Sequence, residues 1–462
     1  MPNETAGVLL PQNPSNQRAI QFLCEEYRKY NRIDPAYYDV YNVKRGLRNN
    51  DGTGVLAGLT QVCNVHGYVL DEGEKAPVDG VLTYRGIKVN DLIEGCVQDD
   101  RFGFEEAIWL LLFGRLPNRE QLETFRGILA SQCELPTSFF EDIILKNPSR
   151  NLMNMLARSV LALYAYDPNP DSNEFENLIR QSISLIARMP VIMVAAYQVK
   201  RRAFERESLY VHDPRPDFSI AENILHSLRS DMQFTREEAK LLDICLILHA
   251  EHGGGNNSAF TARSVSSTGS DTYSAIAAAI GALKGPRHGG ANFKVMEMLD
   301  FLKEEVANPD DDAQVKDFLA RLIRGETGDR SGLVYGMGHA VYTRSDPRAV
   351  ILKKYALRMA AGTPIEREFQ LLDAVERLTP EVFASIKGSK KDICANVDMY
   401  SGLVYKMLKI PYDMYTALFA AARTTGWCAH RVEEVVYGDR LIRPAYKSLA
   451  KDQAYLPMEE RD

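Results

Sequence analysis

The sequence predicts an all-α protein. Most of its 462 residues fall in segments where apolar side chains recur at helical spacing between turn signals. Strand signals are few, and the best of them is Gly80 to Val89, "GVLTYRGIKV", with a turn at Arg85-Gly86. No repeat of fixed period and no low-complexity segment interrupts this pattern. The chain is long enough for two or three domains around a large core.

The first helices are predicted from periodicity and turn signals together. Four segments combine both features: residues 104–114, 120–132, 174–189 and 219–229. A longer segment at 236–255, "REEAKLLDICLILHAEHGGG", predicts a helix that is closed by glycines. The alanine-rich run "SDTYSAIAAAIGALKGP" predicts another helix, capped by Ser270 or Asp271 and stopped by Gly285-Pro286.

Further helices are predicted downstream. The segment 291–306 places its apolar residues on one helical face. The sequence "SDPR" predicts a helix start, with Ser345 or Asp346 as the cap and Pro347 in the first turn. Another helix is expected over "YSGLVYKMLKI", directly after Asp398.

Composition and charge limit the possible partners and compartments. Apolar content of 45% and charged content of 25% are typical of a soluble globular protein. A net charge of −7 argues against a nucleic-acid surface but allows local basic pockets for small anions. The start of the chain lacks a signal-peptide pattern, and the longest apolar runs are far shorter than the roughly 20 residues that span a bilayer. Seven scattered cysteines without a Cys-x-x-Cys pair indicate reduced thiols, so we expect a cytoplasmic protein with no nucleic-acid or membrane partner.

The first candidate site residue is His288, in "KGPRHGGAN". Glycines on both sides allow the backbone to turn tightly or to approach a ligand. The residue lies just before a predicted helix, whose N-terminus disfavours a protonated imidazole. A neutral imidazole can still donate a hydrogen bond to a developing oxyanion. The alternative is a histidine that only caps a turn.

A second glycine-framed histidine, His339, follows Gly336 and Gly338 in "YGMGHAVYTRSDPRA". Nine residues later, Arg348 falls in the first turn of a predicted helix, where a cation is electrostatically disfavoured. A bound anion would stabilise it there. The alternative is an exposed arginine without a role.

Two arginines near the C-terminus are further candidates. Arg423 ends the small apolar run "YTALFAAAR", and a buried guanidinium without a partner is costly. It therefore needs a carboxylate or phosphate, from a ligand or from a structural acidic residue. Arg443, in "RLIRPAY", lies in an extended segment before a proline.

The remaining candidates allow more than one interpretation. His249 and His252 in "LHAEHGGGN" have the i, i+3 spacing of one helix face, but no third spaced ligand supports a metal site. We expect one of them to be a satisfied core histidine and the other a ligand contact. Asp398 in "ANVDMYSG" is either a helix N-cap or a base held close to a carbon acid.

Together these motifs resemble the citrate synthase family. "HAEHGGGN", "GPRHGGAN", "GMGHAVYTRSDPRA", "NVDMYSG" and "ARTTGW" occur in the family's order and at similar spacing. The resemblance covers roughly Val78 to Tyr446 and leaves the first fifty or so residues largely outside it. One departure is Ala395, where the family commonly has proline before Asn-Val-Asp. The spacing of the lysines before Asp398 also varies in the family.

The resemblance implies a catalytic triad of His288, His339 and Asp398. Asp398 would remove a proton from the methyl group of acetyl-CoA while neutral His288 hydrogen-bonds the thioester oxygen. His339 would polarise and protonate the ketone of oxaloacetate, and hydrolysis of the citryl thioester would release citrate and CoA. This is the citrate synthase reaction of the tricarboxylic acid cycle.

The resemblance also implies the binding residues. His252, Arg348 and Arg423 would hold oxaloacetate, and Arg443 would reach in from the partner subunit of a homodimer. CoA would contact Lys387, Lys390 and Lys391 and the backbone at Gly336 and Gly338. The resemblance implies no metal and no bound cofactor. Acetyl-CoA would act as a co-substrate.

The implied architecture is a two-domain helical fold. Residues 1–50 would be an N-terminal extension, 51–288 and 403–462 a large domain, and 289–402 a smaller mobile domain. Two alternatives remain: a 2-methylcitrate synthase that uses propionyl-CoA, and a non-catalytic regulatory relative that binds acyl-CoA. The lyase direction, cleavage of citryl-CoA, is disfavoured because the chain lacks an additional nucleotide-binding domain.

Overall fold

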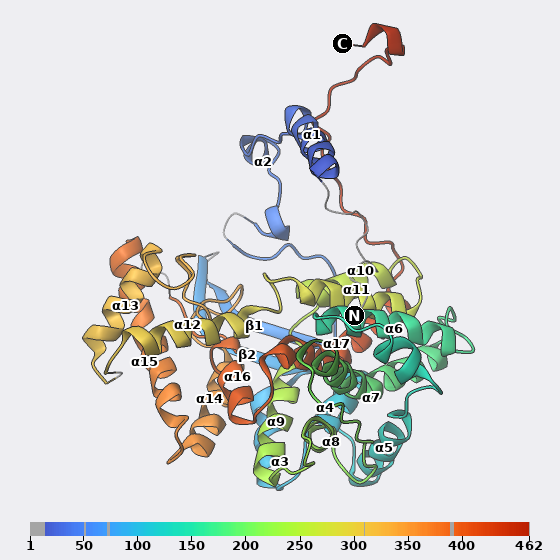
Figure 1. Cartoon of the computed structure of the whole chain (residues 1–462), viewed down its shortest axis with the longest axis vertical. Helices are drawn as coiled ribbons and strands as arrows, with labels where there is room; N and C mark the ends of the chain where they lie inside the picture. Colours follow the sequence, from blue (N-terminus) through green and yellow to red (C-terminus); the bar gives the residue numbers. More distant parts are fainter. Residues whose placement is uncertain (1–13, 50–51, 72–73, 309, 389–391, 462) are drawn as a thin grey trace. The chain divides into compact units, whose positions relative to one another are not determined.

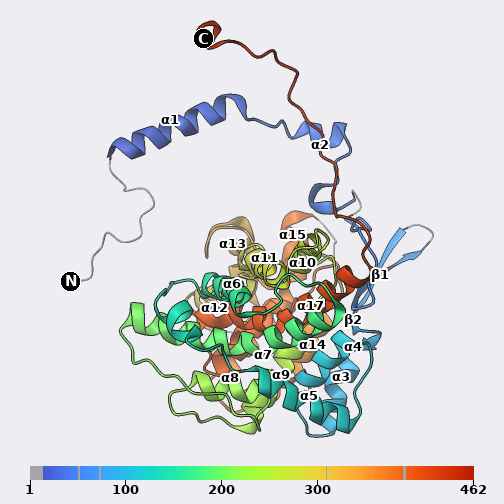
Figure 2. The same cartoon turned by 90° about the vertical axis from the view of Figure 1, so that its right-hand side faces the viewer.

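The fold is mostly helical, as predicted (Figure 1; Figure 2). The computed structural model describes residues 14–49, 52–71, 74–308, 310–388 and 392–461. The first eleven α-helices are α1 (Pro14–Tyr30), α2 (Ala36–Val40), α3 (Val89–Gln98), α4 (Phe104–Phe113), α5 (Arg119–Gln132), α6 (Leu152–Leu163), α7 (Phe175–Lys200), α8 (Ile220–Leu228), α9 (Arg236–His249), α10 (Asn257–Ser266) and α11 (Thr272–Lys284). They are followed by α12 (Ala291–Glu305), α13 (Asp312–Arg324), α14 (Pro347–Ala360), α15 (Glu366–Lys387), α16 (Asp398–Met407) and α17 (Tyr415–Tyr437).

Helix starts follow the local chemistry of the sequence. Capping boxes begin α5, α8 and α9, where a polar side chain and the residue three positions later satisfy free N–H groups. Asp271, rather than Ser270, caps α11. Asp346 caps α14, with Pro347 as the first helical residue.

The described residues contain one small antiparallel sheet of three strands. Its strands are β1 (Cys63–Asp71), β2 (Glu74–Tyr84) and β3 (Ile87–Lys88). Tyr84 pairs with Ile87 across a turn whose residues both have positive φ, Arg85 at 50° and Gly86 at 87°. The predicted turn is therefore confirmed. Strand β1 was missed, because its "CNVHGYVLD" sequence mixes polar and apolar residues without a clear alternation.

The long helix α7 runs through the core. It packs against α17, α6, α5 and α8. Helix α7 and the turn after it, Phe175–Glu205, are long and apolar enough to cross a membrane by length and composition alone. Most of that apolar stretch is buried inside the structure, which is the pattern of a core helix. All seven cysteines are free thiols, and five of them are buried.

Contacts between residues divide the chain into two compact units. Gly58–Ile442 forms one unit, and Met1–Ala57 with Arg443–Asp462 forms the other, called here the chain-end unit. Within the first unit α12 packs on α16, α13 on α15 and α14 on α16; these helices gather at the left of Figure 1. The expected division into a large domain and a small domain of residues 289–402 stays a prediction.

Two helices meet closely at Gly426, in the middle of α17. Its N–H donates to the carbonyl of Ala250, just after α9, at 3.1 Å. A Cβ at Gly426 would collide with that carbonyl and with the carboxylate of Glu251. Only glycine therefore lets α17 approach the end of α9 this closely.

We predict that Gly426→Ala lowers the free energy of unfolding by about 1–3 kcal/mol, because the methyl group overpacks this contact. Gly127→Ala in α5 is the matched control, since a Cβ there meets no atom within 4 Å. It should stabilise the protein by up to about 1 kcal/mol, the usual gain of alanine over glycine inside a helix. Denaturant unfolding of both variants measures the difference, and equal effects would contradict the packing explanation.

Candidate active site

The glycine loop before His339 is paired to the start of α16. Met337 forms an antiparallel bridge with Ala395. The N–H of Gly338 donates to the carbonyl of Cys394, and the N–H of Asn396 donates to the carbonyl of Gly336, both at 2.8 Å. These bonds fix the loop that carries His339 beside the segment that leads into Asp398, which lies 59 positions later in the chain.

Gly336 is needed for this pairing. Its φ is 80°, and a Cβ there would lie 2.9 Å from the Cα of Met399 in α16. Gly338 has a φ of 91°, which also favours glycine. Gly336 therefore serves the close approach of the loop to α16, whereas Gly338 serves the backbone conformation of the loop itself.

His339 is oriented by its own loop. Its Nδ1 accepts hydrogen bonds from the N–H groups of Val341 and Tyr342, both at 3.0 Å. With Nδ1 accepting, a neutral imidazole carries its proton on Nε2. The ring stacks on Tyr342 at 4.6 Å between centroids and meets the ring of His252 edge-on at 5.0 Å.

The loop after His339 rests on the sheet. A Cβ at Gly80 or Gly67 would collide with atoms of Tyr342 and its neighbours. The N–H of Gly80 donates to Ser345 Oγ at 3.1 Å. Strands β1 and β2 thus support the loop that leads from His339 to α14.

His252 is a buried, uncharged imidazole. Burial, together with Arg348 and His339, lowers its pKa well below the ordinary value. Its Nε2 has no hydrogen-bond partner among the described residues. A buried donor or acceptor without a partner is costly, so this nitrogen is suited to a ligand contact.

His249 does not match its sequence-based interpretation. It is the last residue of α9, so His252 lies beyond the helix and the two do not share a helix face. Neither ring nitrogen of His249 has a partner within the described part of the chain, so it is not a satisfied core histidine. Its ring stacks on Phe419 at 4.4 Å.

His288 lies in the turn between α11 and α12, and its neighbours hold it there. Its Nε2 is 3.0 Å from Ser258 Oγ, which also accepts a hydrogen bond from Trp427 Nε1 at 3.1 Å. Thr416 donates to the carbonyl of Gly289 at 2.9 Å. The sequence "GGGNNSA" had not indicated that Ser258 contacts this ring.

His288 is neutral, as expected. Burial and the nearby Arg423 guanidinium lower its pKa to about 4. The cause differs from the expectation, which relied on the helix N-terminus alone. A neutral imidazole at this position can donate a hydrogen bond at neutral pH.

Asp398 is the first residue of α16 and does not cap it. Asn396 Oδ1 accepts from the N–H of Asp398 at 3.0 Å, which leaves the Asp398 carboxylate outside the capping interaction. Burial raises the pKa of Asp398 to about 6, although Arg348 acts in the opposite direction. The interpretation of Asp398 as an N-cap is therefore wrong, and its side chain remains available for chemistry.

Arg348 is buried and paired within the chain. Its Nε and Nη2 lie 3.1 and 2.7 Å from the carboxylate oxygens of Asp346, the cap of α14. Burial acts to lower the pKa of Arg348, but Asp346 outweighs it and raises the pKa. Arg348 is thus held rigidly and is not an exposed arginine.

Arg423 is fully buried and only partly satisfied. Its Nε donates to the carbonyl of His249 at 2.6 Å, and its guanidinium lies 4.7 Å from the ring centre of Phe419. Neither Nη1 nor Nη2 has a hydrogen-bond partner among the residues that the structure describes. Burial lowers its pKa, which Glu251 partly offsets.

A second buried arginine on the same helix is a useful comparison. Arg431 donates from Nε to Thr272, from Nη1 to Ser266, and from Nη2 to Asn173 and the carbonyl of Ser270, all between 2.8 and 3.1 Å. Its hydrogen bonds are complete within the protein. Arg423 therefore stands out through its two unused donors rather than through burial.

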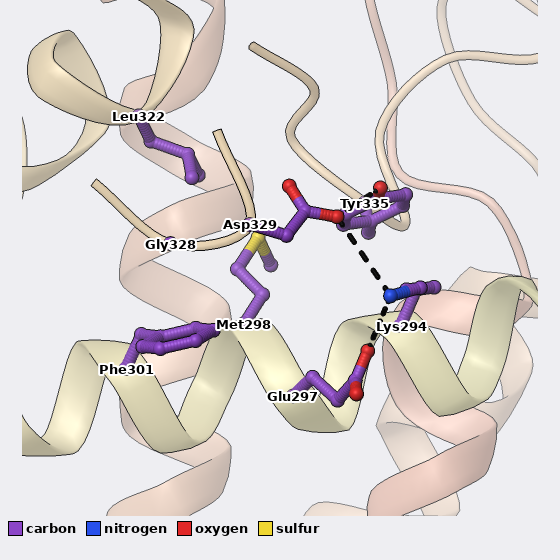
Figure 3. A pocket seen from close by; sticks show the side chains of 8 residues that line it. All are labelled: Lys294, Glu297, Met298, Phe301, Leu322, Gly328, Asp329 and Tyr335. Atoms are coloured by element: carbon purple, nitrogen blue, oxygen red, sulfur yellow. Dashed lines mark hydrogen bonds and ion pairs between the residues drawn. The ribbon is translucent and has the colours of Figure 1, made fainter. Parts of the chain in front are cut away.

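A cluster of side chains ties the loop before His339 to α12 (Figure 3). Lys294 Nζ lies 2.7 Å from a Glu297 oxygen and 3.8 Å from Asp329, and the Tyr335 hydroxyl donates to Asp329 at 2.6 Å. The cavity that these residues line leaves about 10 Å³ for the centre of a water molecule, room for about one water. The cluster anchors the loop before His339 to α12, and its cavity is too small for a substrate.

Four of the predicted binding residues are not part of the contacts described above. Lys390 and Lys391 fall outside the described residues. Lys387 is exposed at the end of α15. Arg443 is exposed in a segment without helix or strand and belongs to the chain-end unit, so its place relative to the other site residues stays a prediction. Within the described ranges, no group of three or more histidines, cysteines or acidic residues could hold a metal ion.

We predict that Arg423→Leu stabilises the ligand-free protein by about 1 kcal/mol or more, because it removes a buried charge with unused donors. A small dicarboxylate such as oxaloacetate should raise the melting temperature of the wild type and leave that of the variant unchanged. Arg431→Leu is the control: it should destabilise by about 1–3 kcal/mol by leaving its acceptors unpaired, yet keep the ligand-induced shift. Thermal unfolding with and without oxaloacetate measures both effects. If oxaloacetate still raised the melting temperature of Arg423→Leu, Arg423 would not be a binding residue for the dicarboxylate.

Comparisons with known proteins identify the family of this chain. Residues 50–445 match the family model described as citrate synthase, C-terminal domain. Citrate synthase 2 of Bacillus subtilis is 36% identical over 391 residues, 83% of this chain and 94% of the relative. 2-Methylcitrate synthase 1 of Corynebacterium glutamicum is 33% identical over 422 residues, 91% of this chain and 98% of the relative.

Solved structures show the same fold. Citrate synthase from Thermotoga maritima aligns with a TM-score of 0.70 and 31% identity over 91% of this chain and 99% of that chain. Citrate synthase from Thermoplasma acidophilum, solved in a ternary complex with carboxymethyl coenzyme A and oxaloacetate, aligns with a TM-score of 0.73 and 28% identity over 91% of this chain and 99% of that chain. This chain belongs to the citrate synthase family of enzymes.

Proposed function

We propose that this enzyme condenses acetyl-CoA with oxaloacetate and water to give citrate and CoA. The observation that carries the proposal is the set of groups around Arg423. This guanidinium, with two unused donors, acts electrostatically on His288, His252 and Asp398. The raised pKa of the Asp398 carboxylate suits proton removal, and the lowered pKa values of the two imidazoles keep them as uncharged hydrogen-bond donors. The unsatisfied guanidinium suits the binding of a dicarboxylate beside them.

In the proposed reaction Asp398 takes a proton from the thioester methyl group. Neutral His288 donates a hydrogen bond to the thioester oxygen, where negative charge develops. The enol carbon then forms a bond to the ketone carbon of oxaloacetate, and the proton on His339 Nε2 moves to the ketone oxygen. Water finally cleaves the citryl thioester, which releases CoA.

Oxaloacetate would satisfy the polar groups left without partners. One carboxylate would pair with Nη1 and Nη2 of Arg423, and the other would lie against Arg348. His252 Nε2 would contact the substrate. Each contact replaces a cost of burial with a charge-assisted hydrogen bond, which supports tight and oriented binding.

The CoA contacts follow from the family resemblance. Lys387, Lys390 and Lys391 would bind the nucleotide phosphates, and the backbone at Gly336 and Gly338 would contact adenine. Closure of residues 289–402 over the site would exclude water from the intermediate. We place the enzyme in the cytoplasm, supported by its seven free thiols.

Propionyl-CoA is the second candidate substrate. The similarity to 2-methylcitrate synthase 1 of Corynebacterium glutamicum supports it. The two thioesters differ by one methylene group, which a pocket discriminates by only about 1–3 kcal/mol. Acetyl-CoA remains the primary proposal.

We also propose a homodimer in which Arg443 reaches the partner's site. The chain-end unit supports this, because none of its described residues is buried. It exposes many large apolar side chains, among them Leu56 and Tyr446 at 87% and 94%. An apolar surface of this kind favours coverage by another protein surface, here a second copy of this chain.

The direct test is release of CoA thiol with oxaloacetate and either acetyl-CoA or propionyl-CoA. We expect a higher kcat/KM for acetyl-CoA, and no release without oxaloacetate. The value of kcat/KM should rise as pH increases to about 6 and then level off, because Asp398 must lose its proton to act as the base.

Asp398→Asn is the control for this assay. It should reduce turnover by several orders of magnitude without loss of folding, because an amide cannot accept the proton. A higher kcat/KM for propionyl-CoA than for acetyl-CoA would identify the enzyme as a 2-methylcitrate synthase. Near-normal turnover by Asp398→Asn would show that Asp398 is not the base.

The shared site can be tested by mixing two inactive variants, Asp398→Asn and Arg443→Met. In a mixed dimer one site would carry both changes and the other site neither. After joint refolding we expect about a quarter of wild-type activity, since about half of the dimers are mixed and each has one intact site. If Arg443 acts within its own subunit, the mixture stays inactive.

A further inference from the structure

The turn that carries His252 is held by buried polar side chains outside the proposed reaction. Glu251, the residue before it, is 0% exposed. One oxygen of its carboxylate, Oε1, accepts a hydrogen bond from the N–H of Gly253 at 2.5 Å and lies 2.9 Å from Nε2 of His430 in α17. The same oxygen therefore closes the turn around His252 and attaches that turn to α17.

Arg263 in α10 fixes the direction of these hydrogen bonds. Its Nε, which can only donate, lies 3.1 Å from Nδ1 of His430, so Nδ1 must accept. A neutral His430 then carries its proton on Nε2 and donates it to Glu251. Arg263 is in turn held by Glu434, at 2.7 Å, and by Glu433. Arg263, His430 and Glu251 thus form a hydrogen-bond relay that ends at the turn of His252.

The segment before His252 is fastened along one face of α17. Three successive residues accept hydrogen bonds from three positions of the helix, which are spaced by three and four residues and so share a face. The pairs are His249 with Arg423 at 2.6 Å, Ala250 with Gly426 at 3.1 Å and Glu251 with His430 at 2.9 Å. The relay therefore supplies the last of the contacts that set His252 relative to Arg423.

A buried polar relay is a costly way to hold two helices together. Burial removes water from its charged groups, and well-packed apolar residues in their place are often as stabilising. Hydrogen bonds instead fix one geometry, because they depend on distance and direction. Next to the relay lie Nε2 of His252 and both Nη atoms of Arg423, which have no hydrogen-bond partner among the described residues. A ligand that contacts both residues requires their relative position to be exact to a fraction of an ångström.

We propose that His430 and Glu251 are positioning residues for oxaloacetate. The relay holds the turn so that His252 and Arg423 contact the same dicarboxylate. This inference rests on the proposed function, in which those two residues bind oxaloacetate. Glu251 itself does not touch the substrate, because its Oε1 is occupied by protein groups and its Oε2 lies against Gly426. His430 and Glu251 act through the turn of His252.

The test compares two substitutions of His430 that replace different ring nitrogens. Glutamine places its amide near Nε2 and can still donate to Glu251, whereas asparagine places its amide near Nδ1 and is too short to reach Glu251. His430→Asn should raise the KM for oxaloacetate by about 10- to 100-fold, because a misplacement of about 1 Å can cost a factor of about 100. It should also reduce the rise in melting temperature that oxaloacetate produces. His430→Gln should keep the KM within about threefold of wild type, since the bond to Glu251 persists.

The KM for acetyl-CoA distinguishes positioning from general loosening. Arg263 keeps its bonds to Glu433 and Glu434 in both variants, so α10 is still held. Helix α10 carries Ser258, which lies beside His288. The KM for acetyl-CoA should therefore stay within about twofold of wild type while that for oxaloacetate rises.

Arg431→Leu is the control on the same helix. It removes a complete set of buried hydrogen bonds next to His430, so it should lower the melting temperature at least as much as His430→Asn. Its KM for oxaloacetate should nevertheless stay within about twofold of wild type. If His430→Asn does not fold, the double variant Glu251→Met/His430→Leu takes its place, because an apolar pair leaves no buried carboxylate without a partner.

The outcomes separate this inference from the proposed function. If the wild type releases thiol and His430→Asn leaves the KM for oxaloacetate unchanged, the inference is wrong and the function stands. Equal effects of His430→Asn and His430→Gln, or equal rises in the two KM values, would also overturn it. If the wild type binds oxaloacetate but releases no thiol, the proposed function fails, and the melting-temperature shifts decide the inference. If the wild type does not bind oxaloacetate, both proposals fail.

Discussion

The site depends on the burial of Arg423 with two unused donors. A guanidinium in the core normally has its hydrogen bonds completed by protein groups, as Arg431 does eight residues later on α17. Arg423 has one such bond, to the carbonyl of His249, and a contact with Phe419. Its positive charge, together with burial, keeps the nearby histidines neutral. The same charge favours the binding of an anion.

The surrounding structure holds the reactive groups in place by backbone contacts. Pairing of Gly336–Gly338 with residues 394–396 brings the loop of His339 to the start of α16. The sheet supports the same loop from the other side, and the cluster around Lys294 ties its beginning to α12. Each support comes from a part of the chain far away in sequence. The geometry is therefore set before a substrate arrives, which is what electrostatic catalysis requires.

Burial gives the carboxylate and the imidazoles opposite shifts. It raises the pKa of Asp398 to about 6 and lowers that of His288 to about 4. Both shifts disfavour charge, so near neutral pH the carboxylate is a stronger base than a free aspartate and the imidazole is an uncharged donor. Arg348 limits the rise at Asp398, so the base still ionises in the physiological range. One environment thus prepares a base and a hydrogen-bond donor for the same proton transfer.

The sequence alone determined the helical fold, most helix starts, the turn at Arg85-Gly86 and the family, because these depend on local periodicity, capping and ordered motifs. It did not determine β1, whose pairing is non-local, or the role of Asp398, where a cap and a free carboxylate look alike in sequence. Only the tertiary structure decided that burial raises the pKa of Asp398 and that burial and Arg423 keep His288 neutral. Burial and long-range neighbours set those properties, and they exist only once the chain has folded.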